Sequence, residues 1–212
     1  MSQTGRPGNW NLPNALTTLR IVMVPFFGIA LLTHGGQSIG WRIVAYLVFA
    51  AAMVTDKVDG DIARKRDLIT NFGKIADPIA DKALTGMAFV GLSVIGEIWW
   101  WVTIVVLIRE WGITLLRLWL VGDGVVVAAN RGGKLKTVLQ TFALGLLVLP
   151  LKQLSGGWNT AGNVVWWVGA LLLAVAVVVT VVTGVDYLVK AIAARRAPER
   201  PASSPHAPGQ GG

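Results

Sequence analysis

The chain has 212 residues, of which 54% are hydrophobic and only 14% are charged. Because a soluble globular domain usually carries about 25% charged residues, this composition excludes an ordinary soluble protein and indicates several membrane spans. The absence of cysteine excludes disulfides, a zinc–cysteine centre and a cysteine nucleophile, and the net charge is +8.

Apolar stretches near the length that a helix needs to cross a hydrocarbon core, about 20 residues, follow one another along the chain. The six predicted spans cover residues 14–33, 41–63, 78–95, 99–120, 137–151 and 164–185. Gly35 and Gly36 should end the first. The expected fold is an all-α, polytopic membrane protein with six transmembrane helices. It comprises a juxtamembrane segment 1–13, a six-helix membrane domain 14–196, and a Pro/Ala/Ser/Gly-rich tail 197–212 that should be disordered.

The basic residues predict the orientation of these spans. Six spans place both chain ends on one side, and seventeen of the nineteen Lys and Arg residues lie on or toward that side, leaving only Arg42 and Lys152 on the other. Positively charged loops stay on the cytoplasmic side of a membrane, so we expect a protein of the cell membrane with both termini in the cytoplasm. The same rule explains the +8 charge without a nucleic-acid partner. An aromatic belt should mark the opposite side, formed by Trp41, Trp99, Trp100, Trp101, Trp158, Trp166 and Trp167.

Six of the eleven acidic residues lie between Asp56 and Asp81. Asp56 and Asp59 are three residues apart at the end of the second span, and Asp77 and Asp81 are four apart at the start of the third, so each pair shares a helix face. Antiparallel helices joined by a short basic connection would bring the four carboxylates together. Such a cluster needs a counter-charge, and its oxygen ligands suit two Mg²⁺ or Mn²⁺ ions that clamp a phosphoryl group.

The same residues form a recognisable motif. Residues 56–64 read Asp-Lys-Val-Asp-Gly-Asp-Ile-Ala-Arg, and residues 73–81 read Gly-Lys-Ile-Ala-Asp-Pro-Ile-Ala-Asp. This pattern, D-x2-D-G-x2-A-R-x8-G-x3-D-x3-D, resembles the signature of the CDP-alcohol phosphatidyltransferase family at every fixed position. The resemblance extends over about residues 9–190.

The resemblance implies that an alcohol attacks the β-phosphorus of CDP-diacylglycerol and that CMP leaves. By the same resemblance, Asp81 would be the catalytic base, and the metal ligands would be Asp56, Asp59, Asp77 and Asp81. The residues implied to bind CDP-diacylglycerol are Asp56, Gly60, Arg64, Thr70 and Gly73.

The flanking segments resemble the branch of this family that uses sn-glycerol 3-phosphate and makes phosphatidylglycerophosphate. They are the opening segment 11–20, the segment 77–82, the Ile-Arg-Glu run 108–110 and the segment 133–137. A phosphorylated acceptor needs its own basic residues, and the candidates are Arg109, Arg117, Lys134 and Lys136, with Arg20 and Asn14 at the start of the first span.

Other interpretations remain open at this point. A cardiolipin synthase or a phosphatidylinositol-phosphate synthase of the same family would use the same aspartates, although the basic residues near Lys134 favour a phosphorylated acceptor over phosphatidylglycerol. A divalent-cation transporter could also use membrane carboxylates, but it predicts acidic residues spread over several spans. The family is often homodimeric, and the helices rich in small residues would allow a homodimer.

Overall fold

The computed structural model describes residues 12–66, 71–122 and 132–196, with side chains described in these ranges except at 12–14, 57–66, 71–77, 121, 132, 134 and 196. All regular elements in these ranges are helical, which confirms the all-α prediction. In chain order they are α1 (Leu12–Leu32), the 3₁₀ helix η1 (Thr33–Gly36), α2 (Ile39–Arg66), α3 (Asn71–Val94), α4 (Trp100–Gly122), α5 (Gly132–Val148) and α6 (Trp158–Arg196).

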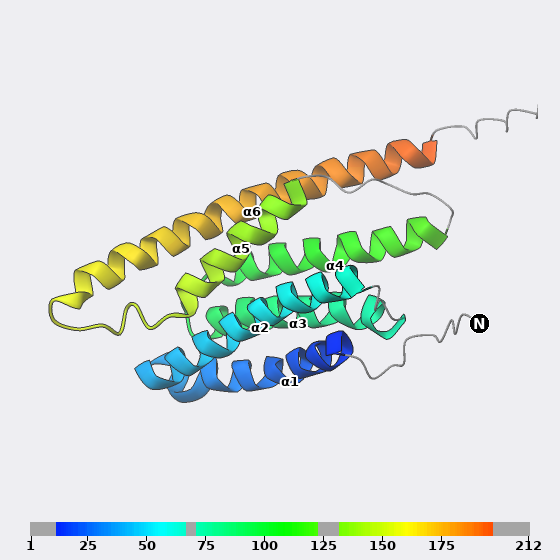
Figure 1. Cartoon of the computed structure of the whole chain (residues 1–212). Coiled ribbons are helices and arrows are strands. Elements are labelled where there is room, and N and C mark those ends of the chain that lie inside the picture. The colour runs from blue at the N-terminus through cyan, green and yellow to red at the C-terminus, as the bar shows by residue number, and fades with distance from the viewer. Residues whose placement is uncertain (1–11, 67–70, 123–131, 197–212) are drawn as a thin grey trace, which may run out of the picture.

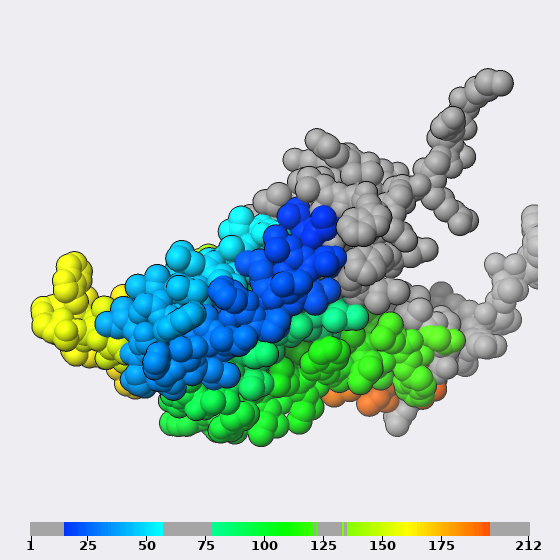
Figure 2. All heavy atoms as spheres, turned by 90° about the horizontal axis from the view of Figure 1, so that it is seen from below, coloured from blue at the N-terminus to red at the C-terminus, as the bar shows by residue number. Residues whose placement is uncertain are grey.

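The helices run side by side as an elongated bundle, with α6 along one edge and α1 along the other (Figure 1). Helix α1 packs against α2 and α3, α5 packs against α6, and α4 contacts both α3 and α6. Figure 2 shows α1 in blue on one face of the bundle, between α2 in cyan and the green of α3 and α4. The first residues of α1 and the last residues of α6 lie at the same end of the bundle.

The two ends of the bundle differ in chemistry, and we name them by their residues. The aspartate end carries Asp56, the last residue of α2 whose side chain is described, and Asp81 in the first half of α3. The tryptophan end carries the turn at 33–38, the α3–α4 connection at 95–99 and the α5–α6 connection at 149–157. The turn confirms the predicted end of the first helix, because Gly35 and Gly36 have φ of 62° and 74°, values that favour glycine.

Several helix boundaries differ from the predicted spans. Helix α3 begins at Asn71, seven residues before Pro78, so this proline lies inside the helix rather than at its start. Helix α6 begins at Trp158 and continues past residue 185 to Arg196. Apolar length alone set the predicted limits, whereas the end of α6 is stabilised by packing, since Tyr187 and Ala191 are buried against Leu120 of α4.

The apolar surface agrees with a membrane-embedded protein. Three segments of the described chain are long and apolar enough to cross a bilayer, Ala15–Gly36, Ile39–Asp56 and Trp158–Arg195, and Leu135–Val148 is a shorter apolar helix. Large side chains such as Leu171 and Val178 are 67% and 61% exposed on α6. A soluble monomer rarely leaves such surface in contact with water, so we treat these faces as lipid-exposed.

The core is built from side chains of all six α-helices of the described chain. Phe27, Leu84, Leu92 and Leu144 are completely buried in it. The rings of Phe27 and Phe49 contact each other with centroids 5.7 Å apart. This shared core fixes the three helices that carry Arg20, Asp56 and Asp81 relative to one another.

Arg42, near the start of α2, binds the end of α5. It is 1% exposed. Its Nε donates to the carbonyl of Val148 at 2.8 Å, and its Nη2 donates to the carbonyls of Leu147 and Leu149 at 2.7 and 3.0 Å. The last carbonyls of a helix have no N–H donor within that helix, so Arg42 supplies the hydrogen bonds that the end of α5 lacks.

The same guanidinium joins a third segment. Its Nη1 donates to Glu97 Oε1 in the α3–α4 connection at 3.1 Å and to the carbonyl of Gly36 at 3.3 Å. Glu97 in turn accepts from Trp166 Nε1 of α6 at 2.8 Å and pairs with Lys152 Nζ at 3.2 Å. One polar network therefore ties together all the connections at the tryptophan end.

We expect Arg42→Met to destabilise the protein strongly. The variant leaves the carbonyls of Leu147, Val148 and Leu149 and the Glu97 carboxylate short of a donor. Removing one partner of a buried ion pair typically costs about 3–5 kcal/mol. Thermal unfolding in detergent micelles measures the effect. Lys190→Met is the matched control, because Lys190 and Asp186 form an exposed pair within α6, which should contribute at most about 1 kcal/mol. Equal melting temperatures for the two variants would contradict the assigned role of Arg42.

Candidate functional site

The aspartate end brings together residues from three helices. Helix α2 carries positions 56 and 59, and helix α3 carries positions 77 and 81. Of these four aspartates, the side chains of Asp56 and Asp81 are described. Asp81 lies within electrostatic range of Asp56. Two like charges this close need neighbouring cations or bound metal ions.

Arg20 of α1 is one of those cations. Its Nη1 lies 2.6 Å from Asp56 Oδ1, and its side chain is completely buried while that of Asp56 is 41% exposed. The sequence placed Arg20 among candidate acceptor residues, but the structure places it directly on the predicted metal ligand Asp56. A buried arginine here holds the Asp56 carboxylate in one orientation and neutralises part of the acidic charge.

Several predicted site residues lie outside the described side chains, namely Asn14, Asp59, Gly60, Arg64, Thr70, Gly73, Asp77 and Lys134. Among the side chains that are described, no three acidic or histidine residues gather as metal ligands. Because Asp59 and Asp77 fall outside that set, the four-carboxylate centre stays a prediction. The two described carboxylates fit it chemically, since hard oxygen donors are what Mg²⁺ and Mn²⁺ prefer.

A second charged cluster surrounds Glu110 of α4. Glu110 Oε1 forms an ion pair with Lys136 Nζ of α5 and lies 3.5 Å from Arg109 Nη1. Lys136 is 5% exposed. From α3, Lys82 Nζ donates to Thr114 Oγ1 and, at 3.4 Å, to the backbone carbonyl of Glu110. Two cations thus pair with the Glu110 carboxylate and a third, Lys82, binds its backbone, which leaves this cluster with an excess of positive charge.

The two clusters adjoin through Asp81. This carboxylate lies within electrostatic range of Arg20, Glu110 and Lys136 as well as of Asp56. The backbone at Asp81 is in turn held by Thr85, whose Oγ1 donates to the Asp81 carbonyl at 2.9 Å. The arrangement therefore places an acidic group beside an excess of cations, which suits a reaction that handles a phosphate and a proton together.

Arg109 also joins α4 to α6. Its Nε donates to the carbonyl of Thr180 at 3.2 Å, and its Nη2 donates to Thr183 Oγ1 at 2.9 Å. Gly184 leaves room for it, because a Cβ at this position would lie 3.1 Å from Arg109 Cγ. These bonds use part of the donor capacity of Arg109, so it supports the α4–α6 contact in addition to bringing charge to the cluster.

Arg117 lies one turn or more beyond this cluster on α4. It is exposed, and its guanidinium lies over the ring of Tyr187 of α6, 5.6 Å from the centroid. Among the described side chains it forms no hydrogen bond or ion pair with Glu110 or Lys136. Among the predicted acceptor residues with described side chains, the structure thus groups Arg109 and Lys136 around one carboxylate and leaves Arg117 at the edge.

Two residues of the site were absent from the sequence-based set. Lys82 was not among the candidates, although a lysine directly after Asp81 within an apolar helix is a signal in itself. In the sequence, Glu110 stands out only as the neighbour of the candidate acceptor residue Arg109. Its central place depends on Lys136 and Lys82, which lie 26 and 28 residues away in sequence, and only the packing of α3, α4 and α5 brings them together.

Comparison with known proteins agrees with the motif. The family model described as CDP-alcohol phosphatidyltransferase matches residues 10–195. A protein of Mycobacterium tuberculosis named probable phosphatidylglycerophosphate synthase is 48% identical over 188 residues, which cover 89% of this chain and 85% of that protein. Proteins named CDP-diacylglycerol–glycerol-3-phosphate 3-phosphatidyltransferase from Bacillus subtilis and Rickettsia typhi are each 39% identical, covering 85% and 84% of this chain and 95% and 94% of their own length.

Proposed function

Since the chain belongs to the CDP-alcohol phosphatidyltransferase family, we propose that it transfers the phosphatidyl group of CDP-diacylglycerol to sn-glycerol 3-phosphate, giving phosphatidylglycerophosphate and CMP. The names of the relatives from Bacillus subtilis and Rickettsia typhi state this donor and acceptor. The observation that supports the proposal is that Asp81 lies within electrostatic range both of Asp56 and of the ion-paired Lys136 and Glu110.

The donor belongs at the aspartates. Asp56, Asp59, Asp77 and Asp81 would hold two Mg²⁺ or Mn²⁺ ions, which supply positive charge to the pyrophosphate and so make CMP a better leaving group. The buried Arg20 keeps Asp56 fixed in this set. Gly60, Arg64, Thr70 and Gly73 complete the proposed CDP-diacylglycerol site on the basis of the family motif.

The chemical step needs one proton acceptor. The Asp81 carboxylate takes the proton of the acceptor's hydroxyl group while the hydroxyl oxygen forms a bond to the β-phosphorus. The bond from that phosphorus to the oxygen of CMP breaks, and CMP leaves with its electron pair. Asp81 suits this role because it adjoins the cationic cluster at which a phosphorylated acceptor would bind.

The phosphate of the acceptor belongs at the second cluster. Lys136 and Arg109 both contact Glu110, which holds them in place with positive charge to spare. Lys134, Arg117 and Asn14 extend the proposed site, and Arg20 adjoins it, since it lies within electrostatic range of Asp81. The carboxylate of Glu110 offsets the repulsion between these cations, so that they stay charged and close together before the substrate binds.

The proposed setting is the cell membrane, with six spans, both termini in the cytoplasm and the active site at the cytoplasmic face. Seventeen of the nineteen basic residues on one side support this orientation. The tryptophan end, with its four tryptophans around the start of α4 and in α6, would face the other side. Glycerol phosphate and CMP are water-soluble, while the diacyl chains stay in the bilayer, so a site at the interface serves both substrates.

An acceptor panel tests the function. Purified protein in detergent micelles with CDP-diacylglycerol and Mg²⁺ should release CMP with glycerol 3-phosphate. Release should be far slower with phosphatidylglycerol, because Lys136 and Arg109 favour a small phosphorylated acceptor, and slower with inositol phosphate, because the relatives are named for glycerol 3-phosphate. Preference for inositol phosphate would reassign the acceptor within the family. Release with no acceptor, together with cation flux into vesicles, would point to a different class of protein.

A further inference from the structure

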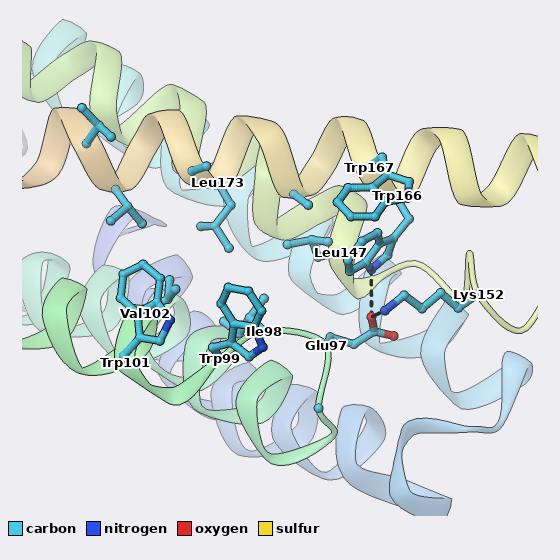
Figure 3. Close-up of a pocket in the computed structure, with 15 residues that line it drawn as sticks. Glu97, Ile98, Trp99, Trp101, Val102, Leu147, Lys152, Trp166, Trp167 and Leu173 are labelled. Carbon is cyan, nitrogen blue, oxygen red and sulfur yellow. Dashed lines mark hydrogen bonds and ion pairs between the residues drawn. The ribbon is translucent and has the colours of Figure 1, made fainter.

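A pocket of about 470 Å³ opens at the tryptophan end of the bundle (Figure 3), and none of the residues that line it is an aspartate. Its volume lies in the range of about 300–1,000 Å³ that is typical of small-molecule sites. The proposed transferase chemistry at the aspartate end does not use it. Figure 3 shows it between the first residues of α4 on one side and α6 on the other, with Glu97 and Lys152 at one edge.

The walls of the pocket are apolar. Trp99 and Trp101 line it from the α4 side, while Trp167 and Leu173 line it from α6. Further along α6 the lining residues are Ala174, Val177 and Val178, so the pocket continues along the helix, and we call this apolar part the channel. Its surroundings on α6 are exposed apolar residues such as Leu171 and Val178. A cavity with these walls in contact with lipid suits an alkyl chain.

One edge of the pocket is charged, and its charges do not cancel. Arg42 and Lys152 both pair with the single carboxylate of Glu97. Arg42 is buried and its other donors bind backbone carbonyls. Lys152 is 40% exposed, and its Nζ lies 3.6 Å from the centroid of the Trp166 ring. The excess positive charge at this edge is therefore presented by Lys152.

We propose that this pocket binds one anionic phospholipid of the membrane leaflet at the tryptophan end, with an acyl chain between α4 and α6 and its phosphate at Lys152. Tryptophans in this number are typical of the interface between headgroups and hydrocarbon, which is where a lipid phosphate and the first methylenes lie. An ammonium group at the mouth of an apolar channel matches the chemistry of that lipid, a negative headgroup joined to an apolar chain.

Photo-crosslinking tests the proposal on the full chain in vesicles. The probes are phosphatidylglycerol and phosphatidylcholine carrying the same diazirine-labelled acyl chain, and the labelled peptides are mapped by mass spectrometry. We expect label in the peptides that hold residues 97–102 and 166–178, about fivefold more with phosphatidylglycerol, the effect of one lysine near an anionic headgroup. Lys152→Gln should remove this difference between the two lipids, and Ala174→Phe should reduce label from both by filling the channel.

Two controls keep the outcome decisive. Lys190→Gln removes an exposed lysine at the other end of α6 and should leave the labelling pattern unchanged. Ala170→Leu fills less of the same channel and should reduce label less than Ala174→Phe, provided that both variants elute as the wild type in size exclusion. Equal labelling of pocket peptides by both lipids in the wild type would overturn the anionic preference. Absence of label there, or crosslinks between two copies of the chain through this face, would overturn the lipid site itself.

Discussion

Asp81→Asn should lower CMP release by at least about 100-fold, the low end of what a positioned general base contributes. The amide keeps the size of the side chain but cannot accept the proton of the attacking hydroxyl. CDP-diacylglycerol should still bind, because Asp56, with its buried partner Arg20, remains in place. The measurements are CMP release at saturating substrates and retention of radiolabelled CDP-diacylglycerol by the purified variant.

Asp186→Asn is the matched control for this experiment. It makes the same change on α6, where Asp186 pairs with Lys190 one turn away on a partly exposed surface. Turnover of this control should stay within a factor of about two, since such exposed pairs contribute little. If Asp81→Asn also retained full turnover, Asp81 could not be the base, and the reaction would need a different proton acceptor near the Lys136–Glu110 pair.

Lys136→Gln should raise the KM for glycerol 3-phosphate by about 10- to 100-fold, the loss of one hydrogen bond between charged groups. Lys136 is the most buried of the described acceptor candidates near Glu110, so few other cations can replace it. The KM for CDP-diacylglycerol should change little, because the donor is assigned to the aspartates. Initial rates of CMP release over a range of each substrate separate the two constants.

A purely structural role for Lys136 makes a different prediction. If Lys136 served only to neutralise Glu110, then Glu110→Gln would remove the need for it, and the double variant would recover a normal KM. If Lys136 contacts the acceptor phosphate, the double variant should stay as weak as Lys136→Gln alone. Lys152→Gln, at the opposite end of the bundle, should leave both KM values unchanged.

The sequence predicted those features that depend on local pattern. The six apolar stretches correspond to six α-helices of the described chain, and the glycine pair at 35 and 36 does end the first of them. The position of Trp99, Trp101, Trp166 and Trp167 around one pocket confirms that these tryptophans gather at one end. The convergence of the four aspartates stays a prediction, and of its members Asp56 and Asp81 lie within electrostatic range of each other.

Contacts between distant helices could not be predicted in this way. The pairing of Arg20 with Asp56 spans 36 positions, and the bonds from Arg109 to Thr180 and Thr183 span more than 70. Such pairs depend on which helices become neighbours and on how each is rotated about its axis, and apolar composition leaves both undetermined in a bundle with lipid around it. The long α6 escaped prediction for the same reason, since the partners of its last turns are on α4.

The bond between Arg42 and α5 bears on how the protein assembles during synthesis. Arg42 emerges from the ribosome about a hundred residues before Leu147, Val148 and Leu149, the backbone acceptors for its Nε and Nη2. Until α5 arrives, a strongly solvated cation must stay hydrated at the membrane surface. Docking of α5 replaces that water with backbone carbonyls and so closes the tryptophan end. We therefore expect insertion of the first two helices and completion of the bundle to be separate events, joined by the bonds of this arginine.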